Sequence, residues 1–506
     1  MPIGKQNIPN NTAALPQMNP EDLIGQSGVQ NVYSDGSADI NIDEQQDSPD
    51  LNNLGIDVEG MIEEAKEAQE EEFYSNLVDE LSQEAQDKLA RDVVESFDAD
   101  KASRKEWEEV LEVGFKNLGL KPEGVTYPFK GACGAFHPLI LEAAVKYQSK
   151  ASLEILPASG PVKCQVLGQV SVEKQQRANR VENHMNWQTT TQMTEYYPDS
   201  ERLFLYAALC GSGFKKVYHN PTLKRSSSEF VSPDQLVVPN SVPDLERAHR
   251  YTHILYKSEA GYNRDVAEGF YSDKDLGEPS KRELTFLQVK QNEILGMTDS
   301  SNPFDFAYTF LEQHVMAYIP ELDKDKGKIA KPYVVTVDKT SMQVVGVRRN
   351  WEFGDKTFGK REYFVHYPFI PGFGFYGFGL IHLLGNYQMT LTAITRSLVD
   401  AGQLANVRGG FKLKGIRTEK QMDEAWSMGE WRDMETGGTA LKDALFPFEY
   451  KEPSPVLLNM LQYLEGRGQQ FADSTEQVVS DATNYGPVGT TMALLDASTK
   501  FFNSFL

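Results

Sequence analysis

A chain of 506 residues is too long for one compact core, and its length predicts about three domains. Apolar residues make up 40% of the chain and aromatic residues 11%, which is enough to build cores. No apolar run reaches the length of about 18 residues that a membrane span needs, and the N-terminus lacks an apolar signal region. We therefore expect neither a membrane protein nor a secreted one.

The net charge of −23 is unevenly distributed. Residues 1–100 contain 24 acidic and 4 basic residues, a net charge of −20, so the rest of the chain carries only −3. Residues 1–60 are also rich in Asn, Asp, Gln, Ser, Pro and Gly, which predicts a disordered acidic arm. A protein that coats DNA needs clustered Lys and Arg against the phosphates, and this chain does not fit that class.

Helical spacing begins after this arm. A helix over 61–97 is predicted from apolar residues four apart: Phe73, Leu77 and Leu81, then Leu89, Val93 and Phe97. Ser103 and Glu106 have the spacing of a capping box and predict a second helix, which should end near Gly119. A third helix is expected over 139–153. A strand is expected over 161–172 and a long polar helix over 173–197.

The middle of the chain is predicted to be rich in strands. Residues 203–257 should contain short strands at 214–218, 236–238 and 252–256. Residues 265–297 look helical and polar. The clearest β segment is 308–367, where the runs 333–337 and 342–345 flank a short hairpin connection.

The strongest predicted helix begins at residue 380. Its apolar residues follow a heptad-like seam: Leu380, Leu384, Tyr387, Leu391, Ile394, Leu398 and Ala405. A helix of about 25 residues is expected, ending at Gly409, with the helical segment at 265–297 as its partner. A last helix is expected over 457–479.

A glycine motif, Gly372 to Gly377, precedes this helix and fits the spacing G-x-G-x-x-G. A dinucleotide site is not expected there. Pro368 and Pro371 break the strand that should lead into the turn, aromatic residues crowd the glycines, and the first acidic residue is Asp400. The alternative interpretation is an aromatic-lined bend that lets chains approach closely.

No other motif points to catalysis. The chain has no P-loop, its eight histidines do not have metal-site spacing, and no hydrolase elbow is present. Cys133, Cys164 and Cys210 are interpreted as reduced thiols. We expect a protein that is not an enzyme and holds no cofactor and no metal.

Basic residues gather after the long predicted helix: Arg396, Arg408, Lys412, Lys414, Arg417 and Lys420. The structural interpretation is ordinary surface charge and compensation of the helix dipole. The functional interpretation is a patch that lies near DNA or between subunits.

Several stretches, in order, resemble the portal proteins of short-tailed bacteriophages over about residues 98–500. The stretches are Asp98, Ser103, Arg104 and Trp107; 118–120; 127–129 with 138–143; 156–163; 211–216 and 231–238; 348–351; 365–367; 396–402; 409–412; and 487–491 with 493–495. The resemblance implies an α+β portal fold with a helical and β wing, a helical stem and a small β clip, assembled as a ring that is usually a dodecamer.

The resemblance also implies a division of the chain. It consists of the acidic arm at 1–60, the N-terminal part of the wing at 61–264, a first stem helix region at 265–307, a β-rich clip or adjoining wing sheet at 308–367, the long stem helix at 368–406, a channel-proximal segment at 407–455 and a wing or crown helix at 456–506. Members of the family usually continue further, so a minimal crown or an incomplete sequence is expected.

In such a ring, which sits at one capsid vertex of the virion, double-stranded DNA passes through the channel during packaging and ejection. The implied partners are other copies of the chain, the terminase large subunit, the major capsid protein and head–tail adaptor proteins, with assembly in the host cytoplasm and no membrane. Two alternatives stay open: another virion structural protein, such as an adaptor or scaffold, and a nucleotide-binding enzyme built on the glycine motif.

Overall fold

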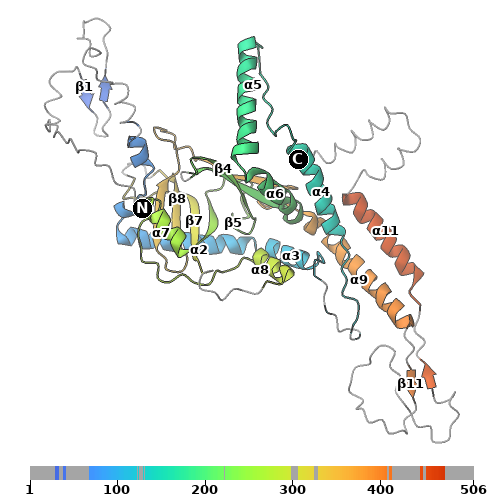
Figure 1. Cartoon of the computed structure of the whole chain (residues 1–506). Helices are drawn as coiled ribbons and strands as arrows, with labels where there is room; N and C mark the ends of the chain where they lie inside the picture. The colour runs from blue at the N-terminus through green and yellow to red at the C-terminus, as the bar shows by residue number, and fades with distance from the viewer. Residues whose placement is uncertain are drawn as a thin grey trace, which may run out of the picture. The chain divides into compact units, whose positions relative to one another are not determined.

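The computed structural model describes residues 29–32, 38–40, 66, 68–121, 124, 129, 131–220, 223–297, 306–323, 329–406, 410–412, 445–447 and 452–472. The chain divides into two units, residues 1–70 and 71–506 (Figure 1). In the first unit, β1 (Val29–Val32) and β2 (Ala38–Ile40) form an antiparallel pair. These two strands fall inside the predicted disordered arm, and the remainder of residues 1–60 lies outside the described residues.

The second unit begins with helices that are shorter than predicted. The chain turns at residues 74–77 and continues as η3 (Val78–Glu80), α2 (Gln83–Ser103) and α3 (Lys105–Lys116), so one helix over 61–97 is wrong. Ser82 caps α2 by accepting a hydrogen bond from the Ala85 N–H. The capping box at Ser103 is also wrong, because that hydroxyl donates to the Asp100 carbonyl inside α2.

Three further helices follow: α4 (Leu139–Ile155), α5 (Val172–Trp187) with a π-helical turn η4 (Gln188–Gln192), and α6 (Tyr196–Cys210). The first two were predicted. The strand over 161–172 is wrong, because residues 161–171 run beside α5 and bond to its side chains instead of to a strand. Sequence reasoning placed the start of the β region inside α6.

Two larger antiparallel sheets lie in the described part of the second unit. One has the order β10-β3-β4, and the other has the order β5-β6-β7-β8-β9. The strands are β3 (Ser212–Asn220), β4 (Arg225–Val231), β5 (Leu236–Val237), β6 (Arg250–Lys257), β7 (Tyr308–Ala317), β8 (Lys331–Asp338), β9 (Val344–Arg349) and β10 (Phe364–Pro368). The predicted hairpin is confirmed as β8–β9. The segment 308–367 nevertheless serves both sheets, since β10 pairs with β3.

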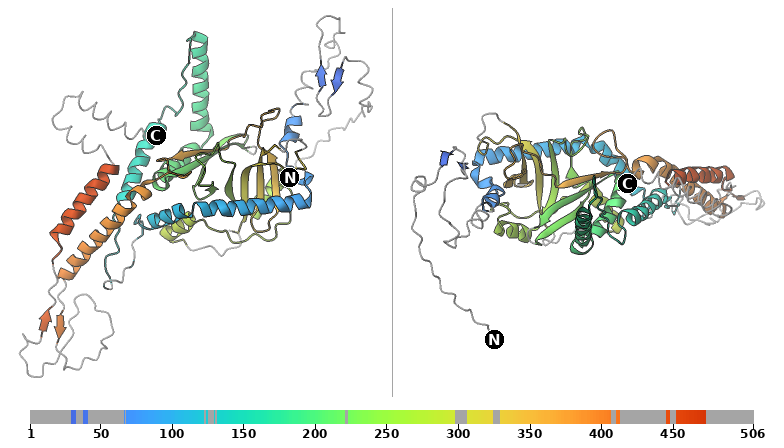
Figure 2. Two further views of the ribbon diagram at one scale, coloured as in Figure 1. Left: turned by 180° about the vertical axis from the view of Figure 1, so that it is seen from behind. Right: turned by 90° about the horizontal axis from the view of Figure 1, so that it is seen from above.

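Two long helices pack side by side at the C-terminal end of the described chain (Figures 1 and 2). The predicted long helix is confirmed as α9 (Leu380–Asn406), and the last predicted helix is α11 (Pro455–Ala472). Between them, β11 (Gly410–Lys412) and β12 (Leu445–Pro447) pair as a short ribbon. The segment at 265–297 is not the partner of α9. It contains only the end of α7 (Glu259–Ala267) and the short helix α8 (Phe286–Leu295), which packs on α3.

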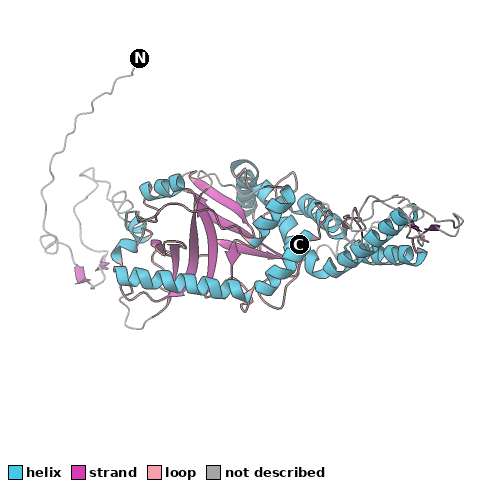
Figure 3. Cartoon of the chain, turned by 90° about the horizontal axis from the view of Figure 1, so that it is seen from below, coloured by secondary structure: helices cyan, strands magenta, loops and turns pink. Residues whose placement is uncertain are grey.

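Two apolar cores hold the unit together. In one, α2 lies across the five-stranded sheet, with Val93 and Phe97 packed among valines of β8 and β9 (Figure 3). In the other, α3, α4, α6 and the start of α9 surround β3 and β10. Burial of these apolar faces is the main source of stability for the fold.

A buried polar cluster joins the two sheets. Lys216 on β3 lies 2.7 Å from the Glu312 carboxylate on β7. The same carboxylate oxygen lies 3.3 Å from Nε2 of His314 and 3.8 Å from Nδ1 of His253. Burial lowers the pKa of His253 to about 4 and also lowers the pKa of His314, although the Glu312 carboxylate opposes both shifts. Both rings are therefore neutral at pH 7.

This cluster predicts a loss of stability at mildly acidic pH. Burial also lowers the pKa values of His366 and His382 to about 4, and unfolding returns each histidine to about 6.5. The unfolded chain then binds more protons below pH 6.5, so the free energy of unfolding should fall as the pH drops from about 6.5 toward 4. Urea titrations at several pH values measure this slope.

Replacing His253 with glutamine should flatten the slope between about pH 6.5 and 5, where few carboxylates titrate. His249→Gln is the matched control, because His249 is exposed. An unchanged slope in His253→Gln would show that this ring does not contribute to the acid sensitivity.

Candidate functional site

One face of α9 carries polar residues spaced four apart that bond to residues 133–140. The Gln388 side chain accepts from the Ile140 N–H at 2.8 Å, Thr392 accepts from the His137 N–H at 3.1 Å, and Asp400 accepts from the Cys133 N–H at 2.7 Å. Arg396 occupies the step between the last two. Its Nε donates to the Ala135 carbonyl at 2.8 Å, and its guanidinium lies 4.5 Å from the centre of the Phe136 ring.

The structure thus places Arg396, the first residue of the predicted basic cluster, in a contact within the chain. Its guanidinium contacts the backbone and an aromatic ring of the loop at 133–140. Lys412 lies in β11, and nothing is described of its side chain. Arg408, Lys414, Arg417 and Lys420 lie outside the described residues. The described residues therefore do not bring the predicted cluster together.

The glycine motif is packed against the protein's own backbone. A Cβ on Gly377 would lie 2.3 Å from the Gly211 carbonyl oxygen, and one on Gly379 would lie 2.3 Å from the Leu209 carbonyl oxygen. Between the glycines, Phe375 and Tyr376 are buried in the core. These contacts show a bend at which two segments of the same chain approach closely, and they leave the glycines turned toward main chain where a pyrophosphate would need space.

Arg104 supports this bend from the α2–α3 junction. Its side chain is buried, with 2% exposure, and Nη1 donates at 2.9 Å to the carbonyls of Pro233 and Leu236 and to the Tyr376 hydroxyl. Nη2 donates to the Asp234 carbonyl, and Nε lies 2.7 Å from Glu108. One guanidinium thus connects the α2–α3 junction, the turn before β5 and the glycine bend.

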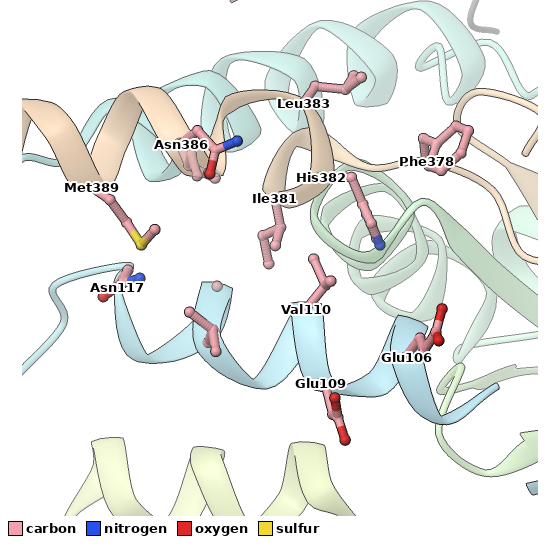
Figure 4. A pocket seen from close by; sticks show the side chains of 14 residues that line it. Glu106, Glu109, Val110, Asn117, Phe378, Ile381, His382, Leu383, Asn386 and Met389 are labelled. Atoms are coloured by element: carbon pink, nitrogen blue, oxygen red, sulfur yellow. The ribbon is translucent and has the colours of Figure 1, made fainter. Parts of the chain in front are cut away.

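A groove of about 870 Å³ opens between α3 and the start of α9 (Figure 4). Val110 on α3 and Ile381 on α9 point toward each other across it, and Met389 lies above Asn117. The exposed carboxylate of Glu106 lies at one end, and that of Glu109 lies on α3 and points away from α9. The two helices come close because α3 has Gly114 where a Cβ would collide with Ile381.

This groove was not among the sites predicted from the sequence. Its signal was present in α3, where Val110 and Val113 are about half exposed, although the helix also carries an apolar face turned to the core. Apolar residues on the outer face of an amphipathic helix indicate a surface that contacts something else.

Further apolar side chains lie exposed on the paired helices α9 and α11. They are Tyr387, Met389 and Val399 on α9, and Val456, Leu458, Met460 and Tyr463 on α11. Several of them are aromatic or methionine residues, which are enriched at protein interfaces. This exposed set makes the helix pair a candidate subunit interface.

The described residues show no group of three or more His, Cys, Asp or Glu side chains placed to hold a metal ion. The three cysteines are free thiols. None of the described helices combines the length and the apolar character of a membrane span. Scans against models of known protein families and against curated proteins found no match for this chain.

Proposed function

We propose that this chain is a portal protein of a tailed bacteriophage, a subunit of the ring through which DNA enters and leaves the capsid. The proposal begins from the ordered set of stretches that resemble short-tailed-phage portal proteins. It further assigns the chain a structural role, with no catalytic step, in a ring that docks a packaging motor and later the head–tail adaptors.

The observation that carries the proposal is the exposed apolar surface of α9 and α11. Tyr463 is 61% exposed and Val456 72% exposed in the single chain, whereas the α9 residues Leu380, Leu384, Leu391 and Ile394 are already buried. Subunits around a closed ring contact their neighbours through two different faces, and such contacts bury residues that one chain leaves in water. The helix pair would then form the stem, and the segment between α9 and α11 would lie near the channel.

Charge is compatible with this role. Outside the acidic first 100 residues the chain is nearly neutral, with a net charge of −3. Dense Lys and Arg contacts along a channel would hold the phosphates of a moving duplex, whereas a nearly neutral surface lets them pass. The Arg396 contact is consistent with this picture, since its guanidinium is engaged by residues 134–136.

The test is the mass and shape of the purified protein, measured by native mass spectrometry and negative-stain imaging. A ring of about twelve chains around a central hole is the expected result. A chain that stays monomeric or dimeric over a wide range of protein and salt concentrations would overturn the proposal and reopen the adaptor and enzyme alternatives.

A further inference from the structure

A second candidate interface is residues 161–187, which consist of α5 and the extended strap at 161–171. This segment, called the arm, is distinct from the acidic arm at residues 1–60. The Asn186 amide bonds to both backbone groups of Val162, at 2.9 and 3.0 Å, and the Glu182 carboxylate accepts from the Cys164 N–H. These bonds hold the strap on one side of α5. Figures 1 and 2 show α5 projecting from the body on the side away from α3.

The arm has no core of its own. Every residue of α5 is at least partly exposed, and apolar side chains of both segments face solvent, including Leu167 at 87% and Trp187 at 48%. An isolated helix of this length is marginally stable in water, so most helices of this kind gain their stability from packing. Surface of this composition, on an element that projects from the body, indicates a partner.

The free face of α5 is both basic and apolar. With about 100° between successive residues, Arg177, Arg180 and His184 lie opposite the strap-bonded residues. Glu173 lies on the same face, and Val181 lies at its edge. Among the described residues, no carboxylate forms an ion pair with Arg177 or Arg180. The apolar share of this face favours a protein partner over nucleic acid, because nonspecific DNA binding relies on Lys and Arg alone.

The α3–α9 groove has the complementary character. Its walls present Val110, Val113 and Met389, each at least 43% exposed. Glu106 at one end and Glu109 on the outer side of α3 supply negative charge beside it, and the nearby cation Lys105 makes only an exposed contact of 3.7 Å with Glu109. An exposed ion pair of this kind contributes little to stability, so Glu109 can form an ion pair with another cation at small cost.

We propose that the arm of one copy of this chain packs in the α3–α9 groove of the next copy, with Arg177 and Arg180 beside Glu106 and Glu109. The arm points away from the groove of its own chain, so the contact is between copies and joins two different faces. Contacts of this type repeat from subunit to subunit and close into a ring when the rotation allows it. The inference rests on the proposed ring and identifies two of the faces that meet in it.

Charge reversal tests the pairing. The double variants Arg177→Glu/Arg180→Glu and Glu106→Arg/Glu109→Arg should each raise the protein concentration needed for assembly by about tenfold or more, because like charges then face each other. The four substitutions combined in one chain should restore most of the assembly. Mass photometry over a dilution series measures the midpoint. Arg247→Glu/Arg264→Glu is the matched control, since both residues are well exposed elsewhere.

A disulfide tests the geometry directly. In a chain with Cys133 and Cys164 replaced by serine, Val181→Cys and Val113→Cys should give a ladder of covalent oligomers on a non-reducing gel, whereas Val181→Cys with Val217→Cys on β3 should not. Val217 is exposed to a similar degree as Val181. A ladder with the first pair and none with the second supports the arm-in-groove contact.

The outcomes separate this inference from the proposed function. If the wild-type ring forms and both charge-reversal variants assemble as well as wild type, the arm inference is overturned and the ring proposal stands. If Arg177→Glu/Arg180→Glu keeps the ring but weakens binding to duplex DNA, the arm is a nucleic-acid surface and the inference is again overturned. A wild-type protein that never assembles overturns both.

Discussion

Replacing Arg104 with methionine should lower the free energy of unfolding by about 3–5 kcal/mol, the range for breaking a buried charged network. Methionine roughly fills the space of the side chain but donates no hydrogen bond. The carbonyls of Pro233, Asp234 and Leu236 would lose their donor, and Glu108 would lose its cation. Urea unfolding at matched protein concentration measures the change, with the slope against urea expected to stay constant.

Arg104→Lys should recover little of this loss, because an ammonium cannot reach several acceptors with the planar fork of a guanidinium. Arg247→Met is the control, since that side chain is 75% exposed and should change the stability by less than about 0.5 kcal/mol. A loss of less than about 1 kcal/mol in Arg104→Met would mean that water replaces the guanidinium at these carbonyls.

Gly211→Ala should destabilise the protein by about 2–5 kcal/mol, from two separate causes. Gly211 ends α6 with φ of 87°, a left-handed conformation that costs an alanine about 1–2 kcal/mol. The added Cβ would also lie 2.2 Å from the Gly377 carbonyl oxygen and 2.4 Å from the Gly379 nitrogen, so the bend would have to move. Thermal or urea unfolding of the two proteins gives the difference.

Gly269→Ala separates the two causes. Gly269 has φ of 70°, and a Cβ there would meet no atom within 4 Å. The decrease in the free energy of unfolding in Gly269→Ala should therefore reflect the backbone conformation alone, about 1–2 kcal/mol. Equal losses at both positions would show that the close approach between Gly211 and the bend has no energetic weight.

The sequence predicted the elements whose apolar spacing is regular. The seam from Leu380 gave α9, and the alternating runs on either side of residues 338–341 gave the β8–β9 hairpin. The spacing of Phe73, Leu77 and Leu81 misled, because Leu77 and Leu81 are buried by a turn and a short 3-10 helix instead of one continuous helix. The spacing of buried apolar residues identifies a helix or a strand only where the backbone conformation is regular.

Contacts between distant parts of the chain were harder to predict, for a physical reason. Strands that pair across the chain, such as β10 with β3, carry no local mark of their partner. The polar face of α9 that bonds to residues 133–140 includes Gln388, Thr392 and Asp400. In the sequence alone, polar residues at this spacing are typical of a solvent-exposed helix face. The basic residues from Arg396 onward are a visible cluster in the sequence. The contact of Arg396 with residues 134–136 forms only when the chain folds.

The close approach of Gly211 to the bend at 377–379 also sets the order in which the chain can fold. The segment that completes the surroundings of α6 and β3 is synthesised about 150 residues or more after them. At about 5–20 residues per second, the ribosome needs on the order of ten seconds or more to supply it. Throughout that time the apolar end of α6 and the edge of β3 that β10 later covers stay open to other chains. Expression at lower temperature should therefore raise the soluble yield. The main reason is reduced aggregation through the open end of α6 and the open edge of β3, and not a more stable folded state.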